Sequence, residues 1–111
     1  MYLYNVTVGI DKEIEHEWLA WIKQNYQPAV MKTGYFTETK IYRIVTHDDQ
    51  SSVSYSLQFF ANKIENVVQY LDKNTAGIIE VHRQQFKDRH VIFNKVLYYV
   101  FNFVCEELQA V

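Results

Sequence analysis

The sequence is poor in cysteine, proline and glycine, with one, one and three of these residues in a chain of 111. The single cysteine, Cys105, excludes an internal disulfide and a metal site built from cysteines, and its expected role is packing. The scarcity of proline and glycine, together with a hydrophobic content of 49%, excludes a disordered or low-complexity chain. The length suits a single domain over residues 1–111.

The sequence also lacks an excess of charge and a long apolar run. Eleven basic and thirteen acidic residues give a net charge of -2 without a basic cluster, so neither nucleic acid nor membrane is an expected partner. The most apolar run, residues 96–105, is too short to span a bilayer and contains Asn102. The N-terminus alternates in polarity and soon reaches Asp11, unlike a signal peptide, so we expect a cytoplasmic protein.

Aromatic residues, in contrast, are abundant. They make up 16% of the chain, including nine Tyr and seven Phe. Tyrosine suits surfaces that are buried at one end and hydrated at the other. This composition favours an interface or a lined cavity.

The first stretch, residues 2–10 with the sequence YLYNVTVGI, alternates in polarity. Its even positions are uniformly apolar, and its odd positions are smaller and mostly polar. A period of two is typical of a strand with unlike faces. One face is expected to contact the core, and the other, too polar for a dry core, is where a function is to be sought.

An amphipathic helix is predicted after Asp11, the expected N-cap, because apolar residues recur at helical spacing. These residues are Ile14, Trp18, Trp21, Ile22 and Tyr26. Pro28 lacks a backbone N–H and is expected to end or kink this helix. Residues 29–31 then add a last turn before Gly34.

Two further strands are predicted, at residues 35–46 and 52–61. The segment between them, residues 47–51, is rich in turn-forming side chains, so the strands should be antiparallel. In the later strand the odd positions are apolar and most even positions are Ser or Gln. The two-faced pattern of the first strand recurs here.

A second helix is predicted after residue 62, because Asn62 and Glu65 have the spacing of a capping box. Residues 74–77 form a weak point that can kink the helix. A fourth strand is predicted at residues 91–101, and residues 102–111 either extend it or turn helical. The apolar stripe of the helix comprises Ile64, Val67, Val68, Leu71, Ile78, Val81 or His82, and Phe86.

The order βαββαβ predicts an α+β, ferredoxin-like fold, with a four-stranded antiparallel sheet and two helices on one face. The first and third strands are then central, and their polar positions form an open sheet face that is too large to leave uncovered in a monomer. We therefore predict a homodimer with the open faces together, closed partly by the fourth-strand aromatics Tyr98, Tyr99, Phe101 and Phe103. The residues predicted for the cavity or dimer face are Asn5, Thr7, Ser54, Ser56, Gln58 and Asn94.

Three stretches carry a family resemblance: YLYNVTVGID, EWLAWIKQNYQPAVMKTGYF and YSLQFFA. With the strand order and the open polar face, the chain resembles the ferredoxin-like dimeric α/β-barrel superfamily. More closely, these stretches look like a small bacterial family known only as a domain of unknown function. The resemblance covers nearly the whole chain and implies a fold and dimerisation, without a catalytic signature.

The superfamily includes antibiotic-biosynthesis and haem-degrading monooxygenases, which are small dimers with a pocket between sheet and helices. The haem-degrading members use an Asn on the first strand and a Trp and a His on the second helix. By this resemblance Asn5 and His82 correspond to the Asn and the His, and Tyr70 lies nearest to the position of the Trp. A tyrosine lacks the indole donor, and the alternation points Asn5 away from the helix of His82. Haem is therefore expected only under a monooxygenase alternative, and otherwise no cofactor is expected.

His82 is the strongest single candidate for chemistry, because a neutral imidazole on an apolar helix stripe can ligate haem iron or act as a base. The alternative is a histidine at the edge of the core, with one nitrogen hydrogen-bonded and the other hydrated. Glu13, His16 and Glu17 lie one helical turn apart, but a solvated helix start explains them. No metal site is expected.

The sequence contains no Gly-rich phosphate loop, nucleophile elbow or recognisable carboxylate pair, so nucleophilic hydrolysis is not expected. We expect a cytoplasmic homodimer that acts as a ligand-binding or protein-interaction module. One alternative is a monooxygenase-like enzyme with Asn5, Tyr70 and His82 near its pocket. Another is a structural or regulatory protein whose aromatic C-terminal segment docks on another chain. The polar sheet face could form a hydrated interface or a ligand cavity, and the interface is favoured.

Overall fold

The structure, a computed structural model, describes residues 1–45, 51–87 and 89–99. For residues 90–94 and 98 it describes the backbone only. The predictions for residues 102–111, for most of the 47–51 turn and for Cys105, Phe101 and Phe103 lie outside the described residues.

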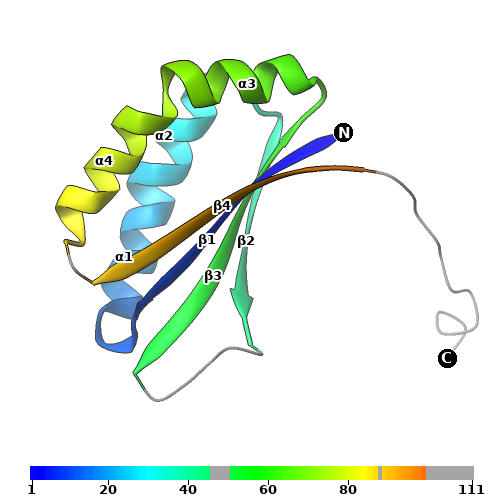
Figure 1. Cartoon of the computed structure of the whole chain (residues 1–111). Helices are drawn as coiled ribbons and strands as arrows, with labels where there is room; N and C mark the ends of the chain where they lie inside the picture. Colours follow the sequence, from blue (N-terminus) through cyan, green and yellow to red (C-terminus); the bar gives the residue numbers. More distant parts are fainter. Residues whose placement is uncertain (46–50, 88, 100–111) are drawn as a thin grey trace, which may run out of the picture.

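Four strands form one antiparallel sheet in the order β2-β3-β1-β4. The strands are β1 (Tyr2–Asp11), β2 (Glu38–Ile44), β3 (Ser52–Ala61) and β4 (His90–Tyr98). β1 and β3 lie in the centre (Figure 1). The predicted topology is confirmed, although β2 is shorter than the predicted strand at residues 35–46, and β4 begins one residue earlier than predicted.

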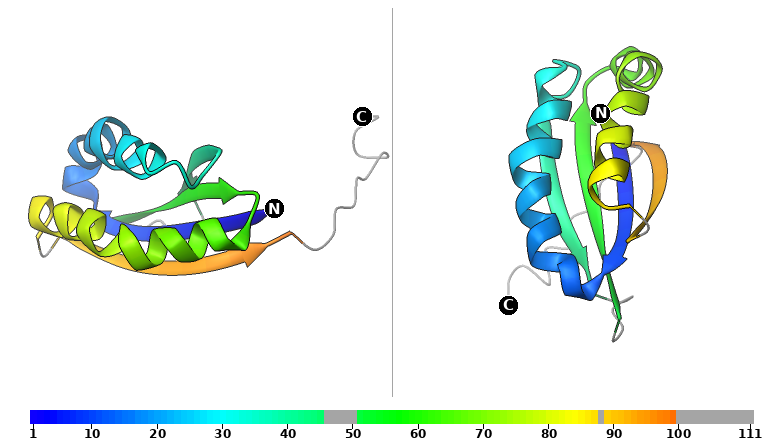
Figure 2. Two further views of the ribbon diagram at one scale, coloured as in Figure 1. Left: turned by 90° about the horizontal axis from the view of Figure 1, so that it is seen from above. Right: turned by 90° about the vertical axis from the view of Figure 1, so that its left-hand side faces the viewer.

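Two helical runs cover one face of the sheet (Figure 2). The first run, residues 12–32, consists of the 3-10 turn η1 (Lys12–Ile14), α1 (Glu15–Trp21), the π-helical turn η2 (Ile22–Tyr26) and α2 (Gln27–Lys32). The second run, residues 64–85, consists of α3 (Ile64–Lys73) and α4 (Thr75–Gln85). The fold is therefore the expected two-layer α+β sandwich. Within the described residues no helix is long and apolar enough to cross a membrane.

The core lies between the sheet and the helical runs. β1 buries its even positions and β3 its odd positions, as the alternation predicts. The register pairs Tyr4 with Phe59 and Val6 with Leu57, and directly opposed residues in antiparallel strands share a face. Both strands therefore direct their buried apolar side chains toward the helices, and their polar side chains, with Leu3 and Phe60, toward the open face.

The first helical run continues through Pro28 to Lys32, and Gly34 follows it with a φ of 82°. Pro28 lies directly after the π-helical turn, where Gln27 N–H bonds Ile22 O and the hydrogen-bond pattern already departs from that of a regular α-helix, so the missing N–H of Pro28 does not end the run. Four residues at spacings of four are fully buried along this run: Trp18, Ile22, Tyr26 and Val30. In a regular α-helix this spacing drifts by about 40° per step, and the wider π-helical turn offsets the drift.

The second helical run corrects the prediction at two places. α3 begins after Lys63, whose backbone is extended, and no side chain caps it, so the capping box expected from Asn62 and Glu65 is wrong. The helix is interrupted at Asn74, which lies in the predicted weak point at residues 74–77. The buried residues of this run are Val67, Tyr70, His82 and Phe86, whereas the predicted Ile64 and Val68 are exposed. Of the predicted alternatives Val81 and His82, His82 is the buried residue.

Candidate functional site

Five of the six polar residues predicted for the open sheet face lie there, and Asn94 is the exception. Asn5 is opposite Gln58, Thr7 opposite Ser56 and Gly9 opposite Ser54, and none of the described helices covers them. Ser56 Oγ donates to Asn5 Oδ1, Asn5 Nδ2 donates to Thr7 Oγ1 at 2.9 Å, and Gln58 Nε2 donates to Ser56 Oγ at 3.2 Å. These side chains thus form a hydrogen-bonded row across β1 and β3. Such a row lets polar groups enter an interface without losing every partner.

The register separates Asn94 from this row. Asn94 of β4 is paired with Val6, which lies on the helix-covered face, and Lys95 is paired with Asn5. The sequence grouped Asn94 with Asn5 because the register of the fourth strand cannot be derived from a run that is apolar on both sides. Lys95, which is exposed, is the β4 residue opposite Asn5.

One end of the open face is apolar. A hollow of about 220 Å³ lies there, lined by Met1, Leu3, Phe60, Leu97 and Tyr99. Lys40 of β2 lies beside it, with its Nζ 5.5 Å from the centre of the Phe60 ring. The open face therefore combines a polar centre with an apolar end.

His82 is enclosed in the core. Only 1% of its surface is exposed, and its Nε2 accepts a hydrogen bond of 2.9 Å from Trp18 Nε1. Accepting at Nε2 requires the neutral tautomer with its proton on Nδ1. The rings of Trp21 and Phe86 lie 5.7 Å and 5.3 Å away. The nitrogen that a metal or haem iron would need is thus occupied by an indole N–H.

The three residues suggested by the haem-degrading enzymes do not converge. Asn5 lies on the open face, whereas Tyr70 of α3 and His82 of α4 are buried between the helices and the opposite face of the sheet. Tyr70 is fully buried against Tyr4 and Phe36, with ring centres 5.6 Å and 5.1 Å apart. Among the described residues, no group of three or more His, Cys, Asp or Glu side chains is placed to hold a metal ion.

Three tyrosines from different elements gather in the core. Tyr4 of β1 shares a hydrogen bond of 3.4 Å with Thr75, at the junction of α3 and α4. The hydroxyls of Tyr26 and Tyr70 are both buried; that of Tyr26 has no hydrogen-bond partner among the described residues, and that of Tyr70 lies near Thr75. Burial raises the pKa of Tyr26 well above its usual value, and nearby Tyr70 and Tyr4 raise it further. Burial and Tyr4 likewise raise the pKa of Tyr70, although nearby Thr75 offsets part of the rise.

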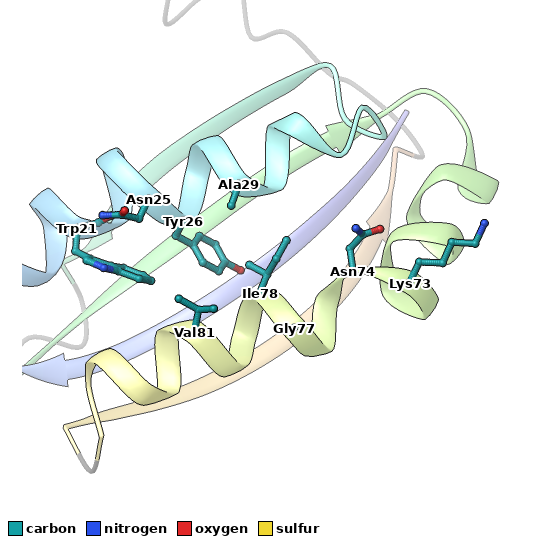
Figure 3. A pocket seen from close by; sticks show the side chains of 9 residues that line it. All are labelled: Trp21, Asn25, Tyr26, Ala29, Lys73, Asn74, Gly77, Ile78 and Val81. Carbon is teal, nitrogen blue, oxygen red and sulfur yellow. The ribbon is translucent and has the colours of Figure 1, made fainter.

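A cavity of about 400 Å³ lies between the two helical runs (Figure 3). Its residues come from η2 and its flanks on one side and from the α3–α4 junction on the other: Trp21, Asn25, Tyr26, Ala29, Lys73, Asn74, Gly77, Ile78 and Val81. Sequence reasoning missed this cavity. The signals were present, because the small residues Ala29 and Gly77 lie beside apolar positions, but only the packing of the two runs makes them face one another.

A polar cluster joins α1 to the sheet. Tyr55 Oη donates to Glu15 Oε2 at 2.5 Å, and Arg43 Nε donates to the same oxygen at 3.0 Å. These two hydrogen bonds, with that of Tyr55 the larger cause, lower the pKa of Glu15. Burial and Glu15 raise the pKa of Tyr55 to about 12.

A carboxyl group with a lowered folded-state pKa stabilises the protein above its unfolded-state pKa and loses this effect as the pH falls through the folded-state value. We therefore expect the native protein to be more stable than Glu15→Gln at pH 6, with the difference shrinking as the pH falls below the usual pKa range of a glutamate. Urea unfolding followed by circular dichroism at several pH values measures this. Glu17→Gln, at an exposed position of the same helix, is the matched control. A difference between native protein and Glu15→Gln that stays constant with pH would contradict the assignment.

Comparisons with known proteins agree with this fold. A family model described as a domain of unknown function matches residues 1–100. No curated protein matches the chain. A dimeric ferredoxin-like protein from an uncultured marine organism is similar with a TM-score of 0.64 and 12% identity, over 95% of this chain and 100% of that one.

Two de novo designed proteins are similar as well. Foldit4 has a TM-score of 0.61 and 7% identity, over 89% of this chain and 98% of its own. LFR1 1, described as having a ferredoxin fold, has a TM-score of 0.51 and 19% identity, over 95% of this chain and 93% of its own. At these identities the likeness concerns the fold, and a fold shared with designed proteins carries no activity.

Proposed function

Because the chain belongs to the DUF4286 family, a domain of unknown function, we propose its role from its own surfaces: it is a homodimeric binding module whose subunits join through their open sheet faces. The single observation that carries this proposal is the open face itself. It bears a satisfied polar row at its centre and an apolar hollow at one end. Neither the described helices nor the described loops cover it.

The size of the face supports a second copy as its occupant. At ordinary strand spacing and rise, four strands of seven to ten residues span roughly 19 Å by 30 Å, or just under about 600 Å². Two such faces bury about 1,200 Å², at the lower end of the range for specific interfaces. A twofold axis through the polar row would bring like faces together, as isologous dimers require.

The similar marine protein supports the proposal too, because its description calls it dimeric. The lone cysteine fits a compartment that keeps thiols reduced, and we place the dimer in the bacterial cytoplasm. The monooxygenase alternative receives no comparable support, since Asn5 lies on the other side of the sheet from Tyr70 and His82.

Two adjacent residues of β4 test the interface. Leu97 is opposite Leu3 on the open face, and Val96 is opposite Tyr4 on the helix side, with exposures of 46% and 43%. We expect Leu97→Glu to weaken the dimer more than tenfold, because two carboxylates would enter an apolar interface. Val96→Glu should leave the dimer unchanged.

Sedimentation equilibrium measures the dimer constant of each variant, and native mass spectrometry of the native protein reports its assembly directly. Circular dichroism checks that both variants fold. A native protein that stays monomeric would reject the proposal. If both substitutions weakened the dimer equally, the subunits would instead pair through the edge of β4. This result would also contradict a dimer that forms through the open sheet faces.

A further inference from the structure

The cavity between the helical runs is held open by small residues. Ala29 and Gly77 lie on its opposite walls. Gly77 is exposed, and a Cβ built on it would meet nothing within 4 Å, so a larger side chain has room there to extend over the cavity. The volume of about 400 Å³ lies within the range of sites that hold small organic molecules.

The walls of this cavity favour an uncharged, flat occupant. Trp21, Ile78 and Val81 supply apolar surface, and Asn25 and Asn74 supply amides. Lys73 is the only charged residue of the lining, and its side chain is exposed and extends away from the cavity (Figure 3). An exposed ammonium group contributes little to binding an anion. An aromatic ring can instead contact the indole of Trp21 and the aliphatic side chains.

Tyr26 gives the cavity a specific polar group. Its ring reaches from the first helical run toward Ile78, with the hydroxyl at its tip (Figure 3). The residue is 2% exposed, and its hydroxyl has no hydrogen-bond partner among the described residues. A buried hydroxyl without a partner is unfavourable, and a ligand atom that accepts its proton removes this cost. Ile78, which is half-buried and lies beside Tyr26 in the lining, would have to rotate for a ligand to reach the hydroxyl.

We propose that the interhelical cavity binds a neutral, planar aromatic molecule with one hydrogen-bond acceptor, its ring beside Trp21 and its acceptor on the Tyr26 hydroxyl. The cavity lies on the helix side of the sheet, away from the face that joins the subunits. This inference therefore goes beyond the proposed dimer and does not depend on it. Leu97→Glu should bind the same molecule as well as the native protein does.

Two probes of similar shape test this proposal. 2-Acetylnaphthalene carries a carbonyl acceptor, and naphthalene carries none. The chain contains two tryptophans, so a proton–nitrogen NMR spectrum shows two indole N–H signals. We expect both probes to shift the signal of Trp21, which lines the cavity, and to leave that of Trp18, which donates to His82, in place.

Substitutions then separate the ring from the acceptor. Tyr26→Phe should weaken binding of the ketone by about two- to tenfold, the effect of one hydrogen bond, and leave naphthalene binding unchanged. Gly77→Leu should abolish binding of both probes by filling the cavity. Ala76→Leu, at an exposed position of α4 outside the lining, is its matched control and should bind normally.

Three results would overturn the proposal. The first is a native protein whose Trp21 signal stays in place with saturating ketone. The second is undiminished binding in Gly77→Leu, which would place the probe elsewhere. The third is a Tyr26→Phe variant that binds both probes more weakly by the same factor. This would show that the Tyr26 hydroxyl makes no hydrogen bond to the ketone. None of these results bears on the dimer, because sedimentation measures that separately.

Discussion

Trp18→Phe is expected to lower the free energy of unfolding by about 2–4 kcal/mol. The substitution removes the N–H that His82 Nε2 accepts and leaves that buried nitrogen without this donor. Losing a partner in the core costs about 1–3 kcal/mol, and the space left by the smaller ring adds about 1 kcal/mol. Urea unfolding followed by far-ultraviolet circular dichroism measures the loss without relying on tryptophan fluorescence.

Trp21→Phe is the matched control for this prediction. Trp21 is half-buried at the cavity, and its ring contacts Phe86 with centres 5.4 Å apart. No hydrogen bond from its N–H is found among the described residues, so its replacement should cost only about 1 kcal/mol. Equal losses for Trp18→Phe and Trp21→Phe would show that the bond to His82 contributes nothing beyond ring volume.

Tyr26→Phe is expected to raise the free energy of unfolding by about 1–2 kcal/mol. The ring stays in place against Phe59, with centres 6.0 Å apart, and only the buried hydroxyl without a described partner is removed. Most substitutions in a core destabilise the protein, so a gain here is diagnostic. The same urea experiment measures it.

Tyr4→Phe provides the contrast, because the Tyr4 hydroxyl shares a hydrogen bond with Thr75. Its loss should destabilise the protein by about 0.5–1.5 kcal/mol. If Tyr26→Phe were also destabilising, the Tyr26 hydroxyl would have a partner in solution. A gain in stability together with weaker ketone binding would mark Tyr26 as a residue that serves binding at the expense of stability.

The sheet could be predicted from the sequence because its signal is local. In β1 and β3 every second residue is apolar, and such alternation identifies both the strand and its buried face. The polar row of Asn5, Thr7 and Ser56 follows directly from that alternation. The helix break at Asn74 was equally readable, because asparagine and glycine weaken helices wherever they occur.

The errors have a common physical origin in tertiary packing. Asn94 was grouped with Asn5, but the register of β4 depends on its pairing with β1, which its own apolar run does not encode. Val68 was assigned to the core and Tyr70 was not, because Val67, Val68 and Leu71 fit one apolar stripe, and only the packing against Tyr4 and Phe36 makes Tyr70 the buried residue. The cavity could not be predicted, because it forms only where the Ala29 side of one helical run faces the Gly77 side of the other. The spacing of residues within one run does not indicate which side faces the other run.

The π-helical turn η2 constrains how the chain can change in length. A π-helical turn accommodates one residue more than the α-helical turn it replaces. Eleven residues at about 100° each, in place of twelve, still complete about three turns, so deleting one residue between Trp18 and Val30 would give a regular α-helix without rotating the residues that follow. Val30, which is fully buried, would then stay in the core. When DUF4286 sequences are aligned, a single-residue gap in this segment therefore marks a protein whose first helical run is a regular α-helix that meets the sheet through the same residues.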